Sequence, residues 1–279
     1  MRVSFATRAG STDKPSEDFA AANPRVVLVL DGLSSPPELG SGCVHGTPWF
    51  VARLGTQILS EATCRWERPL ADCVADAITA VAAAHADSCD LAHLGTPSSS
   101  VAVVREGQET LEYLAIFDSV IVFDGPAGPR VVTDLRADDY AREEHAETMR
   151  HRIGTREHQR AVTSLVAAQR PFRNQPGGYW VAAVTPDSAR NAVTGTVARD
   201  SVDRLAVLSD GASCLVDDYD QVSWPEFMDL LAAEGPERII DKVRAAEAGD
   251  REGVRWPRYK RSDDSTVVYG ELERLGQRR

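Results

Sequence analysis

The strand-like and helix-like segments of this chain are grouped instead of alternating. Short β-rich runs gather in two groups, and helical patterns come in pairs near each end of the sequence. A parallel sheet built from strand–helix–strand units requires regular alternation of the two. The order of the segments therefore excludes that class and predicts a layered α+β fold. We expect residues 1–279 to form a single domain.

Apolar periodicity places the individual elements. Apolar runs predict strands at residues 19–21, 26–30, 101–104, 111–116, 120–123, 131–132, 179–184, 205–208 and 265–269. Helical spacing predicts helices with apolar faces at Phe50, Leu54, Ile58 and Ala62, and at Leu70, Val74, Ala77, Val81 and Ala84, and further helices over residues 138–152, 155–169, 224–233 and 239–246. Turn residues at 106–108 and 124–126 separate the middle strands, which predicts an antiparallel meander. Residues 277–279 are expected to fray.

Charge and cysteine content limit the surroundings of the protein. With 42 acidic and 31 basic side chains, the formal net charge is −11, which disfavours binding to nucleic acids and membrane surfaces because both are polyanions. The five cysteines are dispersed and form no CxxC pair, which is typical of free thiols in a reducing cytosol. No apolar run approaches the roughly 20 residues that span a bilayer, and no signal-peptide pattern is present. We expect a cytoplasmic monomer.

Carboxylates stand at the ends of several predicted strands. They occur at Glu17-Asp18, Asp31-Gly32, Asp118-Ser119, Asp210-Gly211 and Asp263-Asp264. Hard divalent cations take several oxygen ligands, and strand ends bring distant segments together. Asp-Gly is also a common turn dipeptide, so a turn explains each of these sites when it is taken alone. Five such sites in one chain predict a metal-binding cage.

Six short motifs resemble, in their order, those of the type 2C (PPM) metal-dependent serine/threonine protein phosphatases, and especially bacterial, actinobacterial-like members. The motifs are Ser16-Glu17-Asp18, Leu30-Asp31-Gly32, residues 96–101, Phe117-Asp118-Ser119, residues 208–211 and residues 263–268, so the resemblance covers nearly the whole chain. It implies a four-layer αββα sandwich, in which two central antiparallel sheets are flanked by helix pairs. This agrees with the layered fold expected from the order of the segments.

The resemblance also implies two or three Mn²⁺ or Mg²⁺ ions. By position, it assigns metal-binding roles to Glu17, Asp18, Asp31, Gly32, Asp118, Asp210 and Asp263. Asp31 would bridge two ions and Asp118 would help to bind a third, whereas Asp264 ranks below Asp263. The implied reaction is the hydrolysis of phosphoserine or phosphothreonine monoesters by a water that bridges two ions, with Asp31, Asp210 and Asp263 as the catalytic residues.

The phosphate contact that the resemblance implies departs from the family pattern. Relatives carry an arginine four residues before the glutamate of the first motif, whereas this chain has Asp13 there, followed by Lys14. Residues 141–173 carry seven arginines against four glutamates, and they belong to a flap-like segment at about residues 138–178. We expect cations of these two regions to bind the substrate phosphate. The residues expected to do so are Lys14, Arg150, Arg152 and Arg156.

Three functions stay open at this point. The leading one is a phosphatase that acts on phosphorylated proteins. Asp13, together with Phe117 at a position where relatives have glycine, favours a pseudophosphatase that binds a phosphorylated partner without turnover. A flap that closes over the pocket favours a hydrolase of a small phosphorylated metabolite.

Cys43 and His45 are two potential metal ligands without a second pair beside them. Because a structural zinc site needs four ligands, we interpret this segment as the entry to the following helix. A second interpretation makes His45 a proton donor near the catalytic ions. The spacing of His145, His151 and His158 keeps them off a common helical face, which argues against a histidine metal site there.

Overall fold

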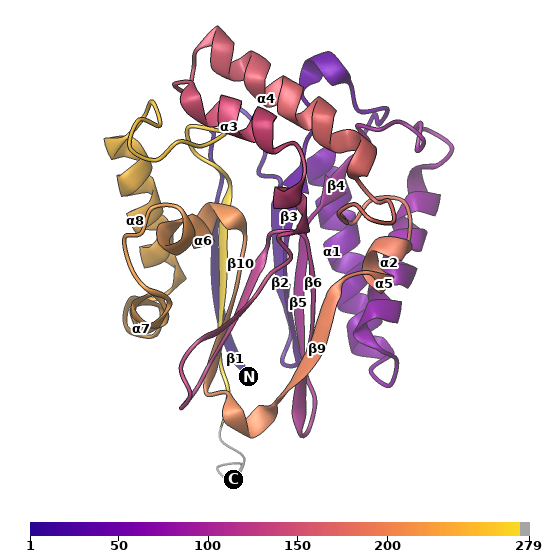
Figure 1. Cartoon of the computed structure of the whole chain (residues 1–279). Helices are drawn as coiled ribbons and strands as arrows, with labels where there is room; N and C mark the ends of the chain where they lie inside the picture. The colour runs from indigo at the N-terminus through magenta and orange to yellow at the C-terminus, as the bar shows by residue number, and fades with distance from the viewer. Residues whose placement is uncertain (274–279) are drawn as a thin grey trace.

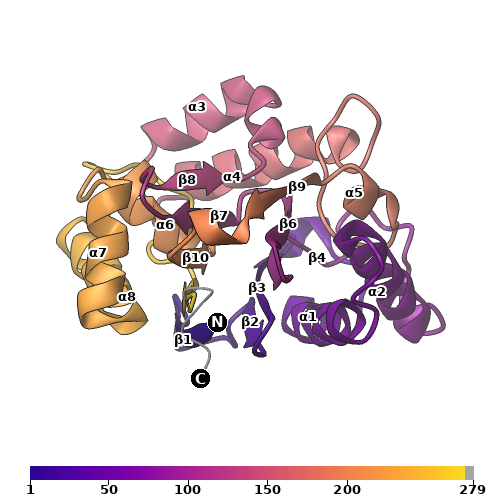
Figure 2. The ribbon, with the colours of Figure 1, turned by 90° about the horizontal axis from the view of Figure 1, so that it is seen from below.

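Two antiparallel sheets are stacked at the centre of the molecule, and helices cover the outer face of each sheet (Figure 1). The view from below in Figure 2 shows α1 and α2 on one side of the stacked sheets and α7 and α8 on the other. This computed structural model describes residues 1–273, so the fraying expected at residues 277–279 lies outside the described part. The predicted αββα sandwich is confirmed.

The first sheet holds the first and the last strand of the described chain, and its order is β1-β11-β10-β7-β8. The bounds are Arg2–Arg8 for β1, Val120–Asp124 for β7, Arg130–Val132 for β8, Arg204–Leu208 for β10 and Ser265–Glu271 for β11. Its outer face is covered by α6 (Asp210–Asp217), α7 (Trp224–Glu234) and α8 (Pro236–Gly249). The predicted helices at residues 224–233 and 239–246 correspond to α7 and α8.

The second sheet has the order β2-β3-β5-β6-β9, and β4 pairs with the end of β3. The bounds are Asp18–Ala22 for β2, Val26–Leu33 for β3, Ser98–Ser99 for β4, Val101–Glu106 for β5, Thr110–Ile116 for β6 and Val193–Ala198 for β9. Helices α1 (Thr47–Cys64) and α2 (Leu70–His85) cover its outer face, and α5 (Asp187–Arg190) packs beside α2.

Strand β3 illustrates how the core forms. Leu28 and Leu30 pack against the helices α1 and α2, whereas Val27 and Val29 pack into the layer between the two sheets. Successive side chains of a strand point to opposite faces, so a strand that is covered on both faces needs a continuous apolar run. On α2 the buried face includes His85, while Ala84, which was expected to be buried, is exposed.

The segment between β8 and β9 lies across the upper end of both sheets in Figure 1. It contains η2 (Arg136–Asp139), α3 (Arg142–Arg150), α4 (Arg156–Gln169) and η3 (Arg170–Phe172); two further short turns are η1 (Pro37–Leu39) and η4 (Arg199–Ser201). The helix predicted over residues 138–152 is therefore shorter than expected. Within the described residues, no helix combines the length and the apolar character that a membrane span requires.

The predicted meander across residues 101–132 is wrong. Strands β5 and β6 pair in the second sheet, whereas β7 and β8 pair in the first. The chain changes sheets at Phe117, whose φ of 65° lies in the left-handed region. Turn residues show that two strands follow each other, but they do not show that the two strands pair.

The predicted strand at residues 179–184 is also wrong. This stretch makes only the isolated bridges of Tyr179 with Arg173 and of Ala182 with Ser99. Tyr179 and Val181 pack around Ala137, while Trp180 and Ala182 face the core beneath α1 and α2. A loop that is buried on two sides in this way has the same apolar pattern as a buried strand. Strand β9 escaped prediction because its threonines are exposed at the sheet edge, and β1 and the short α6 were not predicted either.

Candidate active site

The two sheets bring their acidic strand ends together. In the β2–β3 pair Asp18 stands directly opposite Asp31. Asp210 follows β10 as the first residue of α6, and Asp263 precedes β11, the neighbour of β10. The negative charges of Asp210, Asp18 and Asp263 all act on Asp31. We call the group of Glu17, Asp18, Asp31, Asp118, Asp210 and Asp263 the carboxylate cage.

Burial and mutual repulsion disfavour ionisation in the carboxylate cage. Burial raises the pKa of Asp18 to about 7, against hydrogen bonds from Thr266 and Ser209 that lower it. Burial, followed by the charge of Asp210, holds the pKa values of Asp31 and Asp118 well above the usual range. Like charges at this spacing in a buried site need a counter-charge to stay ionised.

Several oxygen atoms of the cage lack a hydrogen-bond partner. The Oδ1 atoms of Asp18, Asp118 and Asp210 are buried without one. Buried acceptors are nearly always satisfied, so three free oxygens among converging carboxylates need an explanation. Hard divalent cations such as Mn²⁺ and Mg²⁺ bind this donor set. The side chains of the cage therefore fit these ions.

Serines of the sequence motifs fix the carboxylates in place. The Ser209 hydroxyl donates to Asp18 Oδ2 over 2.8 Å and accepts from the Thr266 N–H over 2.9 Å. The Asp31 N–H donates to Ser100 Oγ over 3.1 Å, and the Ser100 and Ser119 hydroxyls lie 2.6 Å apart. These bonds connect strands of both sheets at the cage.

Gly32 and Asp264 hold the backbone beside the carboxylate cage, one by its lack of a side chain and the other by its hydrogen bonds. A Cβ atom on Gly32 would lie 2.5 Å from Thr47 Cγ2 and 2.7 Å from the Glu17 carbonyl oxygen, so only glycine fits beside the cage. The Asp264 carboxylate accepts from the N–H groups of Gly10, over 2.7 Å, and Glu17, over 2.6 Å. Asp264 thus holds the segment that leads into β2.

Two of the chain's three lysines lie beside the carboxylate cage. Lys14 Nζ is 3.4 Å from Glu17 Oε2. Lys260, which the sequence analysis missed, donates to Asp263 Oδ1 over 2.7 Å. Burial opposes its charge, but the charges of Asp263 and Asp31 outweigh that effect and raise the pKa of Lys260 above its ordinary value. Its place three residues before Asp263 was the available signal.

The predicted phosphate-binding arginines lie elsewhere on the surface. Arg150 pairs with Glu147 over 2.6 Å, Arg152 pairs with Glu252 over 3.1 Å, and Arg156 is exposed at the start of α4. The cavity beside the cage has a volume of about 350 Å³, and its lining includes Lys260 but none of these arginines. Their role in phosphate binding stays a prediction.

The flap-like segment reaches this cavity through α3, whose His145 and Met149 form part of the lining together with Asp210 and Asp263. The His145 ring meets Tyr259, which lies next to Lys260, with 2.6 Å between Nδ1 and the phenol oxygen. The segment at 138–178 therefore contacts the cavity beside the cage.

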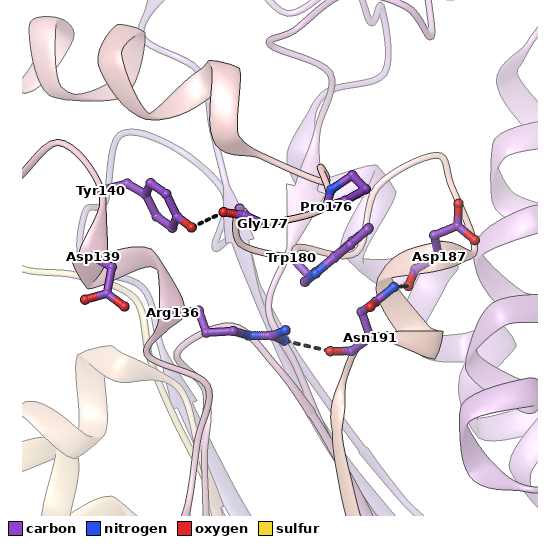
Figure 3. A pocket seen from close by; sticks show the side chains of 9 residues that line it. Arg136, Asp139, Tyr140, Pro176, Gly177, Trp180, Asp187 and Asn191 are labelled. Carbon is purple, nitrogen blue, oxygen red and sulfur yellow. Dashed lines mark hydrogen bonds between the residues drawn. The ribbon is translucent and has the colours of Figure 1, made fainter.

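A larger cavity of about 630 Å³ lies farther along the flap-like segment (Figure 3). Figure 3 shows Tyr140 donating to the Gly177 carbonyl, and Arg136 donating to the Asn191 carbonyl over 2.7 Å. Trp180 lines the same cavity. No carboxylate of the cage lines this cavity, so its size alone does not make it the reactive site.

Comparison with known proteins identifies the family. A sequence model described as Protein phosphatase 2C matches residues 8–245. The chain therefore belongs to the protein phosphatase 2C family, whose members are metal-dependent phosphoric monoester hydrolases that use Mn²⁺ or Mg²⁺. No curated protein matches the chain in sequence.

Solved structures of bacterial phosphatases share the fold. The serine/threonine phosphatase PstP/Ppp of Mycobacterium tuberculosis is 17% identical, with a TM-score of 0.56 and 98% of each chain covered. The PPM Ser-Thr phosphatase MsPP of Mycobacterium smegmatis, in complex with cacodylate, is 15% identical, with a TM-score of 0.57 and coverage of 98% of this chain and 99% of MsPP. The PstP catalytic domain in complex with two manganese ions is 16% identical, with a TM-score of 0.55 and 97% of each chain covered.

Proposed function

We propose that this protein hydrolyses phosphoserine and phosphothreonine monoesters at the carboxylate cage, in a reaction that depends on Mn²⁺ or Mg²⁺. The observation that carries the proposal is the meeting of five buried or half-buried aspartates, three of which have a buried Oδ1 atom without a hydrogen-bond partner. Membership in the protein phosphatase 2C family supplies the reaction class.

The residues take distinct parts in this proposal. Asp31, Asp210 and Asp263 would hold the first ion as the catalytic residues, and the Gly32 carbonyl would be available beside them. Glu17 and Asp18 would serve a second ion, and Asp118 would serve a third. When bound, such ions acidify a water for attack on phosphorus and neutralise charge on the phosphoryl oxygens. The carboxylates of the chain would hold the ions. The Ser209 hydroxyl orients the Asp18 carboxylate, and the Ser100 hydroxyl accepts from the Asp31 backbone N–H.

The substrate phosphate is held by cations that lie next to the cage. Lys260 lines the cavity of about 350 Å³ beside Asp210 and Asp263, and Lys14 stands at Glu17. With divalent ions on the carboxylates, the Lys260 ammonium would be available to donate to a phosphoryl oxygen. Lysine is a point charge and does not grip a phosphate with two parallel bonds as arginine does, so we expect weak substrate binding.

We further propose that the substrate is a phosphorylated protein and that residues 1–279 act as one catalytic domain, monomeric and cytoplasmic. The flap-like segment at about 138–178 contacts the cavity through His145 and Met149, where it is positioned to meet the peptide around the phosphorylated residue. PstP, which is similar in fold, is a serine/threonine protein phosphatase.

Turnover of p-nitrophenyl phosphate with Mn²⁺ tests the proposal, using the full chain beside Asp31→Asn and Asp210→Asn. The matched control is Asp241→Asn, because Asp241 is half exposed, pairs with Arg8 and does not belong to the carboxylate cage. We expect both cage variants to lose more than roughly 100-fold in rate, since removing a group that only hydrogen-bonds to a metal ligand already costs about 10–100-fold. Equal rates in all four folded proteins, or no Mn²⁺-dependent turnover, would overturn it. A phosphopeptide panel then distinguishes protein substrates from small metabolites.

A further inference from the structure

A second set of metal-binding side chains lies where α1 begins and α2 ends. Cys43 and His45 stand just before α1, His85 is the last residue of α2, and Cys89 lies in the turn that follows. The ligand atoms of all four side chains lie within 4.8 Å of one another. We call them the thiol–imidazole cluster. The pair missing beside Cys43 and His45 in the sequence is therefore supplied by a different helix.

The distances within the cluster are those of a tetrahedral site. Cys43 Sγ lies 3.4 Å from Cys89 Sγ and 3.8 Å from His85 Nδ1, and His45 Nδ1 lies 3.9 Å from Cys43 Sγ and 3.3 Å from Cys89 Sγ. Zinc bonds of about 2.3 Å to sulfur and about 2.0 Å to nitrogen place tetrahedral ligand atoms roughly 3.3–3.8 Å apart. These four distances differ from the tetrahedral values by only a few tenths of an ångström, and all the ligand atoms lie within 4.8 Å of one another.

The surroundings of His85 point to a missing partner. This imidazole is 1% exposed, its Nε2 atom is buried without a hydrogen-bond partner, and its Nδ1 atom faces the Cys43 sulfur. A buried polar ring that meets only weak thiol partners is poorly satisfied. The Trp49 ring covers the other side of the group, with its centroid 4.3 Å from that of His45 and 5.2 Å from that of His85. A metal ion bound at Nδ1 would replace the weak thiol contact of this atom.

We propose that the thiol–imidazole cluster binds one Zn²⁺ in a closed Cys₂His₂ site, separate from the carboxylate cage. Two sulfur and two imidazole donors select zinc over the hard cations Mn²⁺ and Mg²⁺. Four protein ligands complete a tetrahedron and leave no position for a substrate, so the site is structural. His45 is exposed, which gives the ion a path of entry. The proposal does not depend on the proposed phosphatase function.

The site braces the segment that leads from β3 into α1. Besides the four ligands, the bond of 2.8 Å from the Asp90 N–H to the Gly42 carbonyl holds this segment to the turn after α2. Thr47, two residues after His45, contacts Ser34 over 3.0 Å, and the Ser34 hydroxyl donates to the cage residue Glu17. Zinc would therefore fix the start of α1 close to the carboxylate cage.

Metal analysis of the full chain, purified without chelator, tests the proposal. We expect about one tightly held zinc per chain, retained in Cys64→Ser and lost in the Cys43→Ser/Cys89→Ser double variant; Cys64 is an exposed thiol outside the cluster. Replacement of zinc by Co²⁺ is expected to give the thiolate-to-cobalt charge-transfer band and the strong visible bands of a tetrahedral site. Co²⁺ bound to the cage has oxygen ligands only and cannot give a thiolate band.

Three results would overturn the zinc site. In the first, the wild-type protein contains no zinc and gives no thiolate-to-cobalt band with Co²⁺. In the second, this band persists in the Cys43→Ser/Cys89→Ser double variant. In the third, protein purified under reducing conditions contains a Cys43–Cys89 disulfide. If the double variant fails to fold, the wild type decides the question: zinc chelation must lower its Tm and zinc addition must restore it.

Discussion

The carboxylate cage and the thiol–imidazole cluster both gather metal-binding side chains, but from different parts of the fold. The cage collects oxygen donors from strand ends of both sheets, and the cluster collects sulfur and nitrogen donors from two helix ends on one side of the sandwich. The cage adjoins a cavity of about 350 Å³. The cluster has the four ligands that a single tetrahedral ion needs and no more.

This difference separates two uses of a metal. Oxygen donors in excess beside a cavity leave coordination positions for water and substrate, as catalysis requires. A complete set of soft donors leaves none and contributes to folding instead. Activity should therefore follow the cage, and stability should follow the cluster.

The largest expected effect is a separation of activity from zinc content. Asp210→Asn should reduce Mn²⁺-dependent turnover by more than roughly 100-fold while the zinc content stays that of the wild type. Loss of zinc from the cluster should instead remove about 3 kcal/mol of folding free energy for an ion present at about 100 times its Kd, a fall in Tm of roughly 5–10 °C. Calorimetry and metal analysis on the same samples measure both. If Asp210→Asn removes the zinc as well as the turnover, the two sites are not distinct.

The stability of the manganese-free protein should depend on pH through the cage. The pKa of Asp18 is raised by burial to about 7 in the folded state, above its unfolded value near 4. Its stabilising contribution is full below about pH 4 and is lost as the pH rises toward about 7, because the unfolded chain releases its proton first.

Thermal unfolding in a manganese chelator at about pH 5 and about pH 8 measures this dependence. We expect the lower Tm at the higher pH, and Asp18→Asn should flatten the slope while Asp241→Asn leaves it unchanged. Saturating Mn²⁺ should oppose the fall, because it binds the ionised carboxylates. A Tm that rises with pH in the chelated protein would contradict the prediction.

A smaller effect is expected where the cage and the start of α1 touch. Gly32→Ala places a Cβ atom 2.5 Å from Thr47 Cγ2 and 2.7 Å from the Glu17 carbonyl oxygen, and such overpacking costs about 1–3 kcal/mol. Gly249→Ala, at the end of α8 with open space around it, is the matched control and should be neutral or slightly stabilising. Urea unfolding of both variants provides the measurement, and equal midpoints would mean that the contact relaxes freely.

The smallest effect concerns the flap-like segment, which belongs to neither metal site. The Thr155 hydroxyl accepts from the His158 N–H at the start of α4, and Thr155→Ala should cost about 1 kcal/mol. Thr163→Ala, inside the same helix, removes only a bond to the Gln159 carbonyl and should cost less. Unfolding curves compare the two, and a larger loss for Thr163→Ala would assign the stability of α4 to another cause.

The parts of the fold that could be predicted are those with strong local periodicity. The apolar faces of α1 and α2 predict helices that are buried on one side. The continuous apolar run of β3 predicts a strand that is covered on both faces. The change of sheet at Phe117 could not be predicted, because the residues of β7 suit either sheet and only packing selects the partner. Strand β9 was missed since an edge strand buries too little apolar surface to leave a pattern.

The sequence by itself determined which carboxylates stand at strand ends, because an aspartate next to an apolar run is a local feature. Only the tertiary structure decided that Lys260 pairs with Asp263 and that His85 and Cys89 complete the donor set begun by Cys43 and His45. The pair Cys43 and His45 stands about 40 residues before the pair His85 and Cys89 in the sequence. The two pairs meet because α1 and α2 pack side by side on one sheet. The residues at the end of one helix do not indicate which other helix end will lie beside them, so this meeting could not be predicted.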